Sequence, residues 1–179
     1  MEFPSETIIL DEVRRVMISP MLEDDDWQSA VAVYNYFITE SMEAYGEQPV
    51  TAEQFKKRHL AKPGYPLFKV TEEDATIGIA GLSPFHHAET ISRTIMVSYF
   101  LLPSHTGQGI GTRLLHMLIE HGTQMGAVNF IAHISSKNHN SIKFHEKHGF
   151  HKCGRVSRAG IKNDQFFDIV WMQKSVEFE

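Results

Sequence analysis

The sequence predicts a single α+β domain in which helices flank a β-sheet. The chain has 179 residues, a length that fits one domain with a sizeable core. Apolar residues alternate along 128–134, as in a half-buried strand, whereas residues 114–119 carry apolar side chains at helical spacing. A strand-like segment, a glycine-rich turn and a helical pattern follow one another along 93–120. We expect residues 14–179 to form the domain and residues 1–13 to be an added arm.

The first half of the chain is predicted to contain two helices between strands. The acidic run 23–26 complements the dipole of a following helix, and Thr51 with Gln54 favours the start of a second. Pro63 and Gly64 end that second helix. The expected elements are one short helix within the arm 1–13, a strand at 16–22, helices at 27–40 and from 51 to before 63, and a hairpin of strands 67–71 and 76–85.

The second half alternates strands and helices more regularly. Residues 138–148 have a helical pattern that stops at Gly149. The expected elements are a central strand at 94–102, a helix at 112–120, a strand at 128–134, a helix at 138–148, and strands at 150–157 and 165–173.

The turn at residues 106–111 is the most informative stretch of the chain. Gly107, Gly109 and Gly111 alternate there, between the central strand and the next helix. Glycine lets the backbone approach a ligand closely, and a helix N-terminus offers unpaired N–H groups and the positive end of its dipole. The pattern therefore predicts a site for a ligand that carries phosphates.

Two common phosphate loops fit this turn poorly. The dinucleotide fingerprint is G-x-G-x-x-G, and the P-loop needs a lysine directly after its last glycine. The segment 106–111 instead resembles the acyl-CoA loop [QR]-x-x-G-x-[GA] of the GNAT N-acetyltransferases. Thr106 departs from that pattern, because it stands where Gln or Arg is usual.

A second block of sequence strengthens the resemblance. Residues 138–150 are similar to the second GNAT signature, N-x-x-S-x-x-[LMF]-[YH]-x-x-x-G-[FY]. The tail 160–171 resembles one branch of the family, the phosphinothricin and methionine-sulfoximine acetyltransferases, and so does segment 33–41. The resemblance covers roughly residues 16–174.

The resemblance implies a fold and a reaction. The fold would be a mixed, mostly antiparallel sheet of about seven strands, flanked by about four helices and splayed at the acyl-CoA site. Acetyl-CoA would be the co-substrate. Its acetyl group would pass to the primary amine of a small molecule, an amino acid or analogue, by direct attack through a tetrahedral intermediate. Dimers are common in this branch, so a homodimer is also implied.

Most of the implied cofactor contacts are backbone groups. Leu101 would supply a backbone N–H to the thioester oxygen. Asn138 would bind the pantetheine arm, although Asn also favours a helix N-cap, and both roles can hold at once. The acyl-CoA residues implied in full are Phe100, Leu101, Leu102, Thr106, Gly107, Gln108, Gly109, Ile110, Gly111, Thr112, Asn138 and Ser141.

The catalytic acid has a candidate, but the base does not follow from the resemblance. His145 is the candidate acid, since imidazole titrates near neutral pH; the alternative is a half-buried histidine packed beside the pantetheine. The branch carries a Glu on the central strand where this chain has Met96, whose thioether cannot take a proton. The open alternatives for the base are His86, His87, Glu89 and Glu40.

Several aromatic residues could line the acceptor pocket or belong to the core: Tyr34, Phe37, Tyr45 and Phe85. We expect no metal, because His145 and His148 are spaced for shared ligation but the chain has no H-E-x-x-H motif and no cysteine cluster.

Composition narrows the partners and the cellular setting. The net charge of −5 and pI of about 6.1 disfavour nucleic acid, and the sequence has no apolar run of membrane-spanning length. Cys153 is alone, which suits a reducing cytoplasm. Besides the small-molecule enzyme, the sequence leaves open a protein or peptide N-acetyltransferase and a non-catalytic acyl-CoA sensor.

Overall fold

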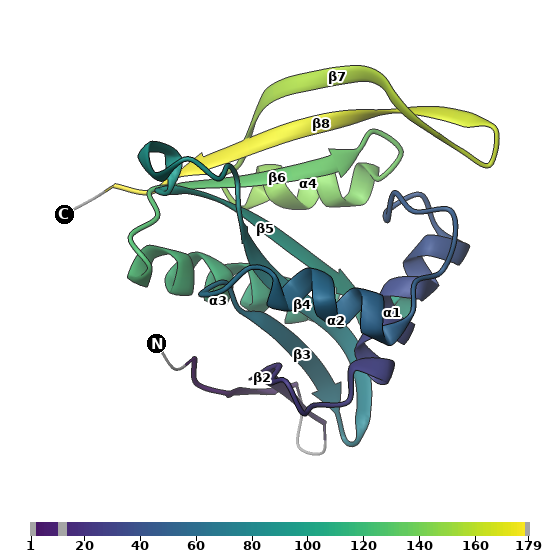
Figure 1. Ribbon diagram of the computed structural model, residues 1–179, viewed down its shortest axis with the longest axis vertical. Helices are drawn as coiled ribbons and strands as arrows, with labels where there is room; N and C mark the ends of the chain where they lie inside the picture. The colour runs from purple at the N-terminus through teal and green to yellow at the C-terminus, as the bar shows by residue number, and fades with distance from the viewer. Residues whose placement is uncertain (1–2, 11–13, 178–179) are drawn as a thin grey trace.

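The computed structural model describes residues 3–10 and 14–177, which form one eight-stranded sheet with helices on both faces (Figure 1). The strand order is β1-β2-β3-β4-β5-β6-β8-β7, and every neighbouring pair is antiparallel except β5–β6. The predicted mixed, mostly antiparallel sheet with four flanking helices is confirmed. The strands are β1 (Glu6–Ile9), β2 (Arg15–Pro20), β3 (Leu67–Glu72), β4 (Ala75–Pro84), β5 (Thr94–Leu101), β6 (Asn129–Ser135), β7 (His151–Lys162) and β8 (Gln165–Ser175).

The N-terminal segment corrects one expectation. Residues Glu6–Ile9 form an edge strand paired with β2, so the short helix expected within residues 1–13 is wrong where the structure describes that segment. Burial alternates along these four residues, with Glu6 and Ile8 half-buried and the other two exposed. That period of two suits a strand on an open sheet edge better than a helix.

Local sequence signals explain where the helices begin. Asp26 accepts hydrogen bonds from the Gln28 and Ser29 amides at the start of α1 (Trp27–Glu40). Thr51 and Gln54 form a reciprocal capping box at the start of α2 (Ala52–Leu60). The remaining helices are α3 (Ile110–Gln124) and α4 (His139–Lys147), with short 3₁₀ turns η1 (Glu89–Ile91) and η2 (Pro103–His105).

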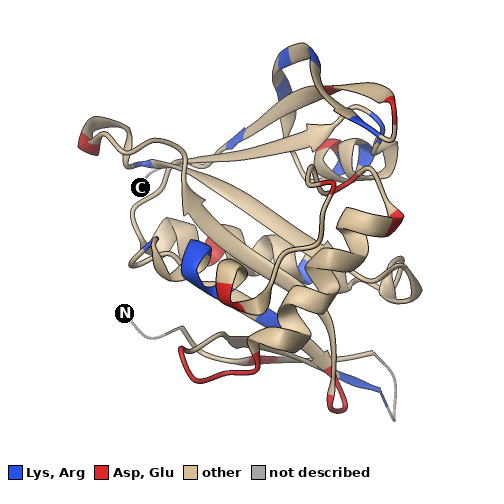
Figure 2. Cartoon of the chain, turned by 45° about the vertical axis from the view of Figure 1, so that its right-hand side comes forward, with Lys and Arg blue, Asp and Glu red and all other residues tan. Residues whose placement is uncertain are grey.

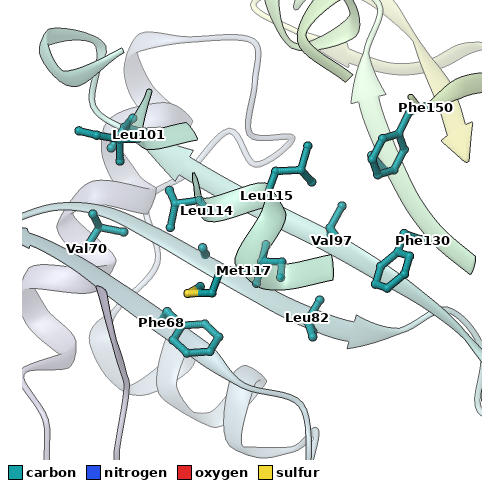
Figure 3. Close-up of a cluster of buried hydrophobic side chains, with 14 of the residues drawn as sticks. Phe68, Val70, Leu82, Val97, Leu101, Leu114, Leu115, Met117, Phe130 and Phe150 are labelled. Atoms are coloured by element: carbon teal, nitrogen blue, oxygen red, sulfur yellow. The ribbon is translucent and has the colours of Figure 1, made fainter. Parts of the chain in front are cut away.

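Two hydrophobic clusters hold the layers together. The larger joins α3 and α4 to the sheet, and Figure 3 shows Leu114, Leu115 and Met117 of α3 packed among side chains of the strands. The smaller packs α1 and α2 on the opposite face, around Phe37 and Phe55. The sheet is therefore a middle layer whose two faces are both covered.

The sheet splits between its fifth and sixth strands. β5 and β6 run parallel but pair only over Thr94–Met96 and Asn129–Ile131, and beyond these residues they diverge (Figure 1). The carboxyl ends of both strands therefore border an opening in the middle of the sheet, as the sequence predicts for the acyl-CoA site.

Among the described residues, no helix is long and apolar enough to cross a membrane. Lys and Arg positions are scattered among Asp and Glu positions in Figure 2 rather than gathered on one face of that view.

Candidate active site

The glycine turn forms an open backbone cradle at the start of α3. Gly107 and Gly109 have φ of 75° and 85°, and a Cβ at either position would meet no atom within 4 Å. Gly109 is the N-cap of α3, and the first helix amide with a backbone acceptor is that of Arg113, which donates to the Gly109 carbonyl. The preceding helix amides have no such acceptor in the described chain, so the geometry fits an anionic diphosphate.

Gly111 differs from the other two glycines. It lies inside α3, which begins at Ile110 rather than at Thr112 as expected. A Cβ at Gly111 would lie 3.7 Å from the Phe144 ring, so this glycine allows α3 to pack against α4.

Side chains of the turn bond to the residues just before it, and His105 links this segment to the sheet. Thr106 donates its hydroxyl hydrogen to the Pro103 carbonyl at 2.8 Å, and Gln108 donates to the Ser104 carbonyl at 3.0 Å. His105 Nε2 lies 3.0 Å from a carboxylate oxygen of Glu72 on β3. Thr106 therefore has a local structural role in place of the Gln or Arg usual at this position.

The end of β5 directs one amide into the split. The Leu102 amide donates to the Ile77 carbonyl on β4 at 2.9 Å, so that amide is already used. Amide directions alternate along a strand, and the Phe100 amide therefore also points towards β4. The Leu101 amide points the other way, towards the opening left by β6. Of these three residues, only Leu101 is oriented to donate to a group held in the split.

The start of α4 brings the second signature to the same opening. Asn138 caps α4 by accepting from the Ser141 amide at 2.9 Å. His145 lies one turn further and is 3% exposed. Its Nδ1 lies 2.8 Å from the Ser141 carbonyl, which can only accept, so Nδ1 carries the hydrogen. Its Nε2 then accepts from the Tyr99 hydroxyl at 3.0 Å.

Burial sets the protonation of this pair. Burial lowers the pKa of His145, with the Ser141 hydrogen bond acting in the opposite direction, so the imidazole is neutral near pH 7. Burial also raises the pKa of the Tyr99 hydroxyl, which therefore keeps its proton.

A cavity of about 330 Å³ connects this opening to the face covered by α1 and α2. Tyr99, Asn138, Ser141 and His145 line the end of the cavity beside α4. The lining at the other end comes from α1, α2, the loop between them, β5 and β6, and includes Tyr34, Glu43, Ala44, Tyr45, Phe55, Arg58, His59, Lys62, Met96 and His133. One space therefore extends from the start of α4, at the split, to a chamber made of side chains, and the glycine turn lies outside its described lining.

A buried lysine holds the loop that borders this chamber. Lys162, at the tip of β7, is 2% exposed and donates to the carbonyls of Ser41 and Ala44 at 2.7 and 2.8 Å. Tyr45 stacks on Phe167 of β8, with ring centroids 5.5 Å apart. The hairpin of β7 and β8 thus fixes residues 41–45 as a wall of the cavity.

Two cations border the same chamber. Arg58 and Lys62 both line the cavity, and within the described chain neither pairs with a carboxylate. Burial and the nearby Arg58 guanidinium lower the pKa of Lys62. Like charges placed together without a counter-ion favour an anionic ligand.

The aromatic residues proposed for acceptor binding separate into two groups. Tyr34 and Tyr45 line the cavity. Phe37 is instead buried in the smaller core cluster, and the half-exposed Phe85 packs against Trp171, so neither belongs to the described lining. Periodicity alone could not separate Tyr34 from Phe37, because the two residues lie three positions apart on the same side of α1.

None of the four sequence candidates for the base belongs to the described lining of the cavity. His86 and His87 stack on each other at 4.1 Å in an exposed loop, and Glu89 is exposed in η1. Glu40 borders a neighbouring surface hollow beside Asn138. Met96 does line the cavity, at the position that the resemblance implies for a base.

The sequence reasoning missed His59, Arg58, Lys62, Glu43 and His133 as lining residues. His133 could have been found: it is a polar residue on the other face of the predicted strand 128–134, just before the second signature. Arg58 and His59 lie on α2, Lys62 lies just after it and Glu43 lies in the loop before it, and the sequence has no functional motif there.

No cluster of three or more His, Cys, Asp or Glu side chains able to hold a metal ion occurs within residues 3–10 and 14–177.

Comparison with known proteins finds relatives over most of the chain. The model of the acetyltransferase (GNAT) family matches residues 30–150, which is more than half of the chain. An L-amino acid N-acyltransferase of Escherichia coli is 26% identical over 156 residues, with 85% of this chain and 90% of that protein covered.

Solved structures share the fold. A phosphinothricin acetyltransferase from Sinorhizobium meliloti in complex with acetyl-CoA is 26% identical, covers 90% of this chain and 88% of its own, and has a TM-score of 0.83. A ribosomal-protein-alanine N-acetyltransferase from Brucella melitensis is 27% identical, with coverages of 89% and 99% and a TM-score of 0.81.

Proposed function

The chain belongs to the acetyltransferase (GNAT) family, and from that premise we propose that it moves the acetyl group of acetyl-CoA to the primary amine of an amino acid or amino-acid analogue. The observations that carry this proposal are the side-chain cavity at the split between β5 and β6 and the open glycine turn that begins α3 at the end of β5. Relatives named for amino-acid and methionine-sulfoximine acylation support the acceptor class.

The cations of α2 support an acceptor with an acidic group. Arg58 and Lys62 have no carboxylate partner among the described residues, so the carboxylate of an amino acid would supply the missing counter-charge. Tyr34 and Tyr45 would contact the rest of the acceptor. The size of the chamber, within a cavity of about 330 Å³, favours a small molecule over a folded protein surface.

The cofactor would be held mainly by backbone groups. The amides at the start of α3 and the open sides of Gly107 and Gly109 would receive the diphosphate, with Gln108 and Thr106 shaping the turn. Asn138 and Ser141 would border the pantetheine arm. Phe100, Leu102, Ile110, Gly111 and Thr112 complete the proposed contact region.

Acetyl transfer would proceed by direct attack. The neutral amine nitrogen bonds to the thioester carbonyl carbon, and the Leu101 amide stabilises the negative charge that develops on oxygen. The carbon–sulfur bond then breaks, and the sulfur leaves with the electron pair. We propose that His145, together with Tyr99, supplies a proton to that sulfur. His145 would donate this proton as the imidazolium, a form that the burial of the ring disfavours before the reaction.

We also propose that the enzyme is a homodimer. Strand β7 lies at the outer edge of the sheet, and most of its twelve residues are exposed. Val156, Ile161 and Phe166 expose about half of their surface on this hairpin, at 50%, 50% and 48%. Light scattering at micromolar concentration tests this, with a monomer mass as the contrary result.

A cytoplasmic setting agrees with the lone cysteine. Cys153 is exposed and free on β7, and an exposed thiol of this kind persists in a reducing compartment. Fractionation of the source cells would test the assignment.

The direct test of the proposed function is thiol release from acetyl-CoA with a panel of amines. The panel holds the amino acids, methionine sulfoximine, phosphinothricin, polyamines and a lysine peptide. The proposal predicts saturable release with one small amino acid or analogue. Release with the peptide alone would support a protein acetyltransferase instead, and acetyl-CoA binding without any release would support a non-catalytic sensor.

A further inference from the structure

The central strand leaves the reaction without a proton acceptor. Met96 lines the cavity on β5, and its thioether cannot take a proton. An α-ammonium group must lose a proton before its nitrogen can attack a carbonyl carbon. The base must therefore come from another side chain that reaches the same part of the cavity.

We propose that His133 is this base, accepting the proton of the acceptor's ammonium group at Nε2. The assignment rests on the proposed function, since it supplies the step that acetyl transfer to an amine requires. Three features of the structure support it: the position of His133 relative to Met96, its hydrogen bond to Tyr45, and the surroundings of its ring.

His133 lies beside the point where the sheet opens. Met96 pairs with Ile131 in the last parallel pair between β5 and β6, so these two side chains share a face of the sheet. His133 is two residues beyond Ile131 and therefore points to the same face. It lines the cavity together with Met96 and His145. A histidine thus stands one strand away from the position where the sequence leaves a base missing.

The hydrogen bonds of His133 leave Nε2 free to accept a proton. The Tyr45 hydroxyl lies 3.1 Å from the His133 carbonyl oxygen and 3.1 Å from its Nδ1. Both contacts are hydrogen bonds only if the hydroxyl donates to the carbonyl and Nδ1 donates to the hydroxyl oxygen. Nδ1 then carries the hydrogen, and Nε2 carries a lone pair with no partner among the described residues.

The surroundings keep this histidine neutral. Burial lowers the pKa of His133, so the imidazole is the main form at pH 7. Burial also raises the pKa of Tyr45 to about 12, so its hydroxyl remains a stable partner. On the β8 side, the Trp171 ring packs against His133, with ring centroids 5.5 Å apart. The other titratable and charged groups that line the same cavity are Tyr34, Glu43, Arg58, His59, Lys62, Tyr99 and His145.

The proposed step balances as a proton transfer followed by attack. The ammonium N–H bond breaks, its proton bonds to His133 Nε2, and its electron pair stays on nitrogen. That nitrogen then forms the bond to the thioester carbonyl carbon and becomes positively charged. As the carbon–sulfur bond breaks, the sulfur takes the electron pair of that bond, and the nitrogen loses its second proton to water in the open cavity. The imidazolium of His133 returns the proton to solvent through the open cavity after the products leave.

The test compares His133→Asn with wild type over a range of pH, using the best acceptor of the amine panel. Asparagine keeps a hydrogen-bonding side chain but cannot take the proton. We expect kcat/KM at pH 7 to fall by roughly 100-fold or more. The deficit should shrink as pH rises towards the pKa of the amine, because free amine then needs no base. Acetyl-CoA affinity, measured by calorimetry, should be unchanged.

Two further variants keep the test decisive. His87→Asn is the matched control, since this exposed histidine lies outside the described cavity lining, and its kinetics should equal those of wild type. Tyr45→Phe removes the acceptor of the Nδ1 hydrogen but keeps the ring on Phe167. We expect it to lose activity to a smaller extent, again with a deficit that depends on pH, even if His133→Asn folds poorly.

Each outcome has one meaning. Unimpaired turnover of His133→Asn, or a deficit of the same size at every pH, would overturn the assignment of the base while leaving the proposed function intact. Absence of wild-type turnover on the whole panel would instead overturn the proposed function itself.

Discussion

The proposed cofactor region and the acceptor end of the cavity are built from different parts of the chain. The proposed cofactor region is mostly backbone: the amides at the start of α3, the glycines before it and the Leu101 amide at the end of β5. The acceptor end is made of side chains from α2, the α1–α2 loop and β6, which are far apart in the sequence. A backbone site needs a short contiguous motif, whereas a side-chain site needs only correct placement in space. We therefore predict that one substitution can weaken the binding of acetyl-CoA and another can raise the KM for the amine, each without the other effect.

The largest expected effect is in the proposed cofactor region, on replacing Gly109 with valine. Valine at φ 85° is strained by about 1–3 kcal/mol, and its side chain would enter the open cradle proposed for the diphosphate. We expect the Kd for acetyl-CoA to rise more than about tenfold, or ~1.4 kcal/mol, by calorimetry.

Gly126→Val is the control for that change. Gly126 has φ 90° and equally open surroundings, but it lies at the opposite end of α3. It should lose comparable thermal stability and bind acetyl-CoA as wild type does. Equal affinity in the two valine variants would mean that the cradle does not hold the cofactor.

The next effect belongs to the acceptor end, on replacing Lys162 with methionine. The carbonyls of Ser41 and Ala44 lose their buried donor, at a cost of about 1–3 kcal/mol in the free energy of unfolding. Because this wall borders the acceptor chamber, we expect a higher KM for the amine and an unchanged Kd for acetyl-CoA.

Lys152→Met is the matched control, since Lys152 is exposed and, among the residues that the structure describes, pairs only with Glu146, at 2.9 Å. Its stability should stay within about 0.5 kcal/mol of wild type by thermal denaturation. A Lys162→Met enzyme with an unchanged KM for the amine would show that residues 41–45 do not shape the acceptor chamber.

The sequence predicts the structure around the proposed cofactor region more readily than it predicts the acceptor chamber. The strand, glycine turn and helix of residues 94–124 carry their own local signals, so the local structure of the proposed cofactor region was predictable from the sequence. Lys162 and Ser41 meet only because the β7–β8 hairpin folds back over the sheet, and no local pattern records that contact. The strand at Glu6–Ile9 was not predicted, because four residues are too few to show an alternating pattern. Its pairing with β2 makes this segment a strand.

A smaller expected effect is the dependence of stability on pH, to which three buried histidines contribute. Burial lowers the pKa of His59, His133 and His145 from the ordinary value of 6.5. The unfolded chain then binds more protons below pH 6.5, so stability is full above that pH and declines as pH falls towards the folded-state values. Thermal denaturation between pH 8 and 5 should show a falling Tm, and His145→Asn should flatten part of the slope. A Tm that is constant over this range would contradict the buried, neutral state of these rings.

The smallest effect is expected for Phe85→Ala. Phe85 packs on Trp171 outside the described cavity lining, so the change should cost about 0.5–1.5 kcal/mol of stability and leave the KM for the amine unaltered. Tyr34→Ala is the contrasting variant, because Tyr34 lines the cavity and contacts Phe55 and Phe100, and it should raise that KM. Steady-state kinetics in which Phe85→Ala has the larger effect would place the acceptor elsewhere.

The most direct test of this two-part site is a matrix of initial rates of thiol release, with acetyl-CoA and the best amino-acid acceptor both varied, for wild type and Lys162→Met. We predict that wild type saturates with both substrates and that the variant raises the KM for the amino acid alone. Parallel increases in both KM values, or release that does not depend on the amino acid, would contradict separate cofactor and acceptor regions.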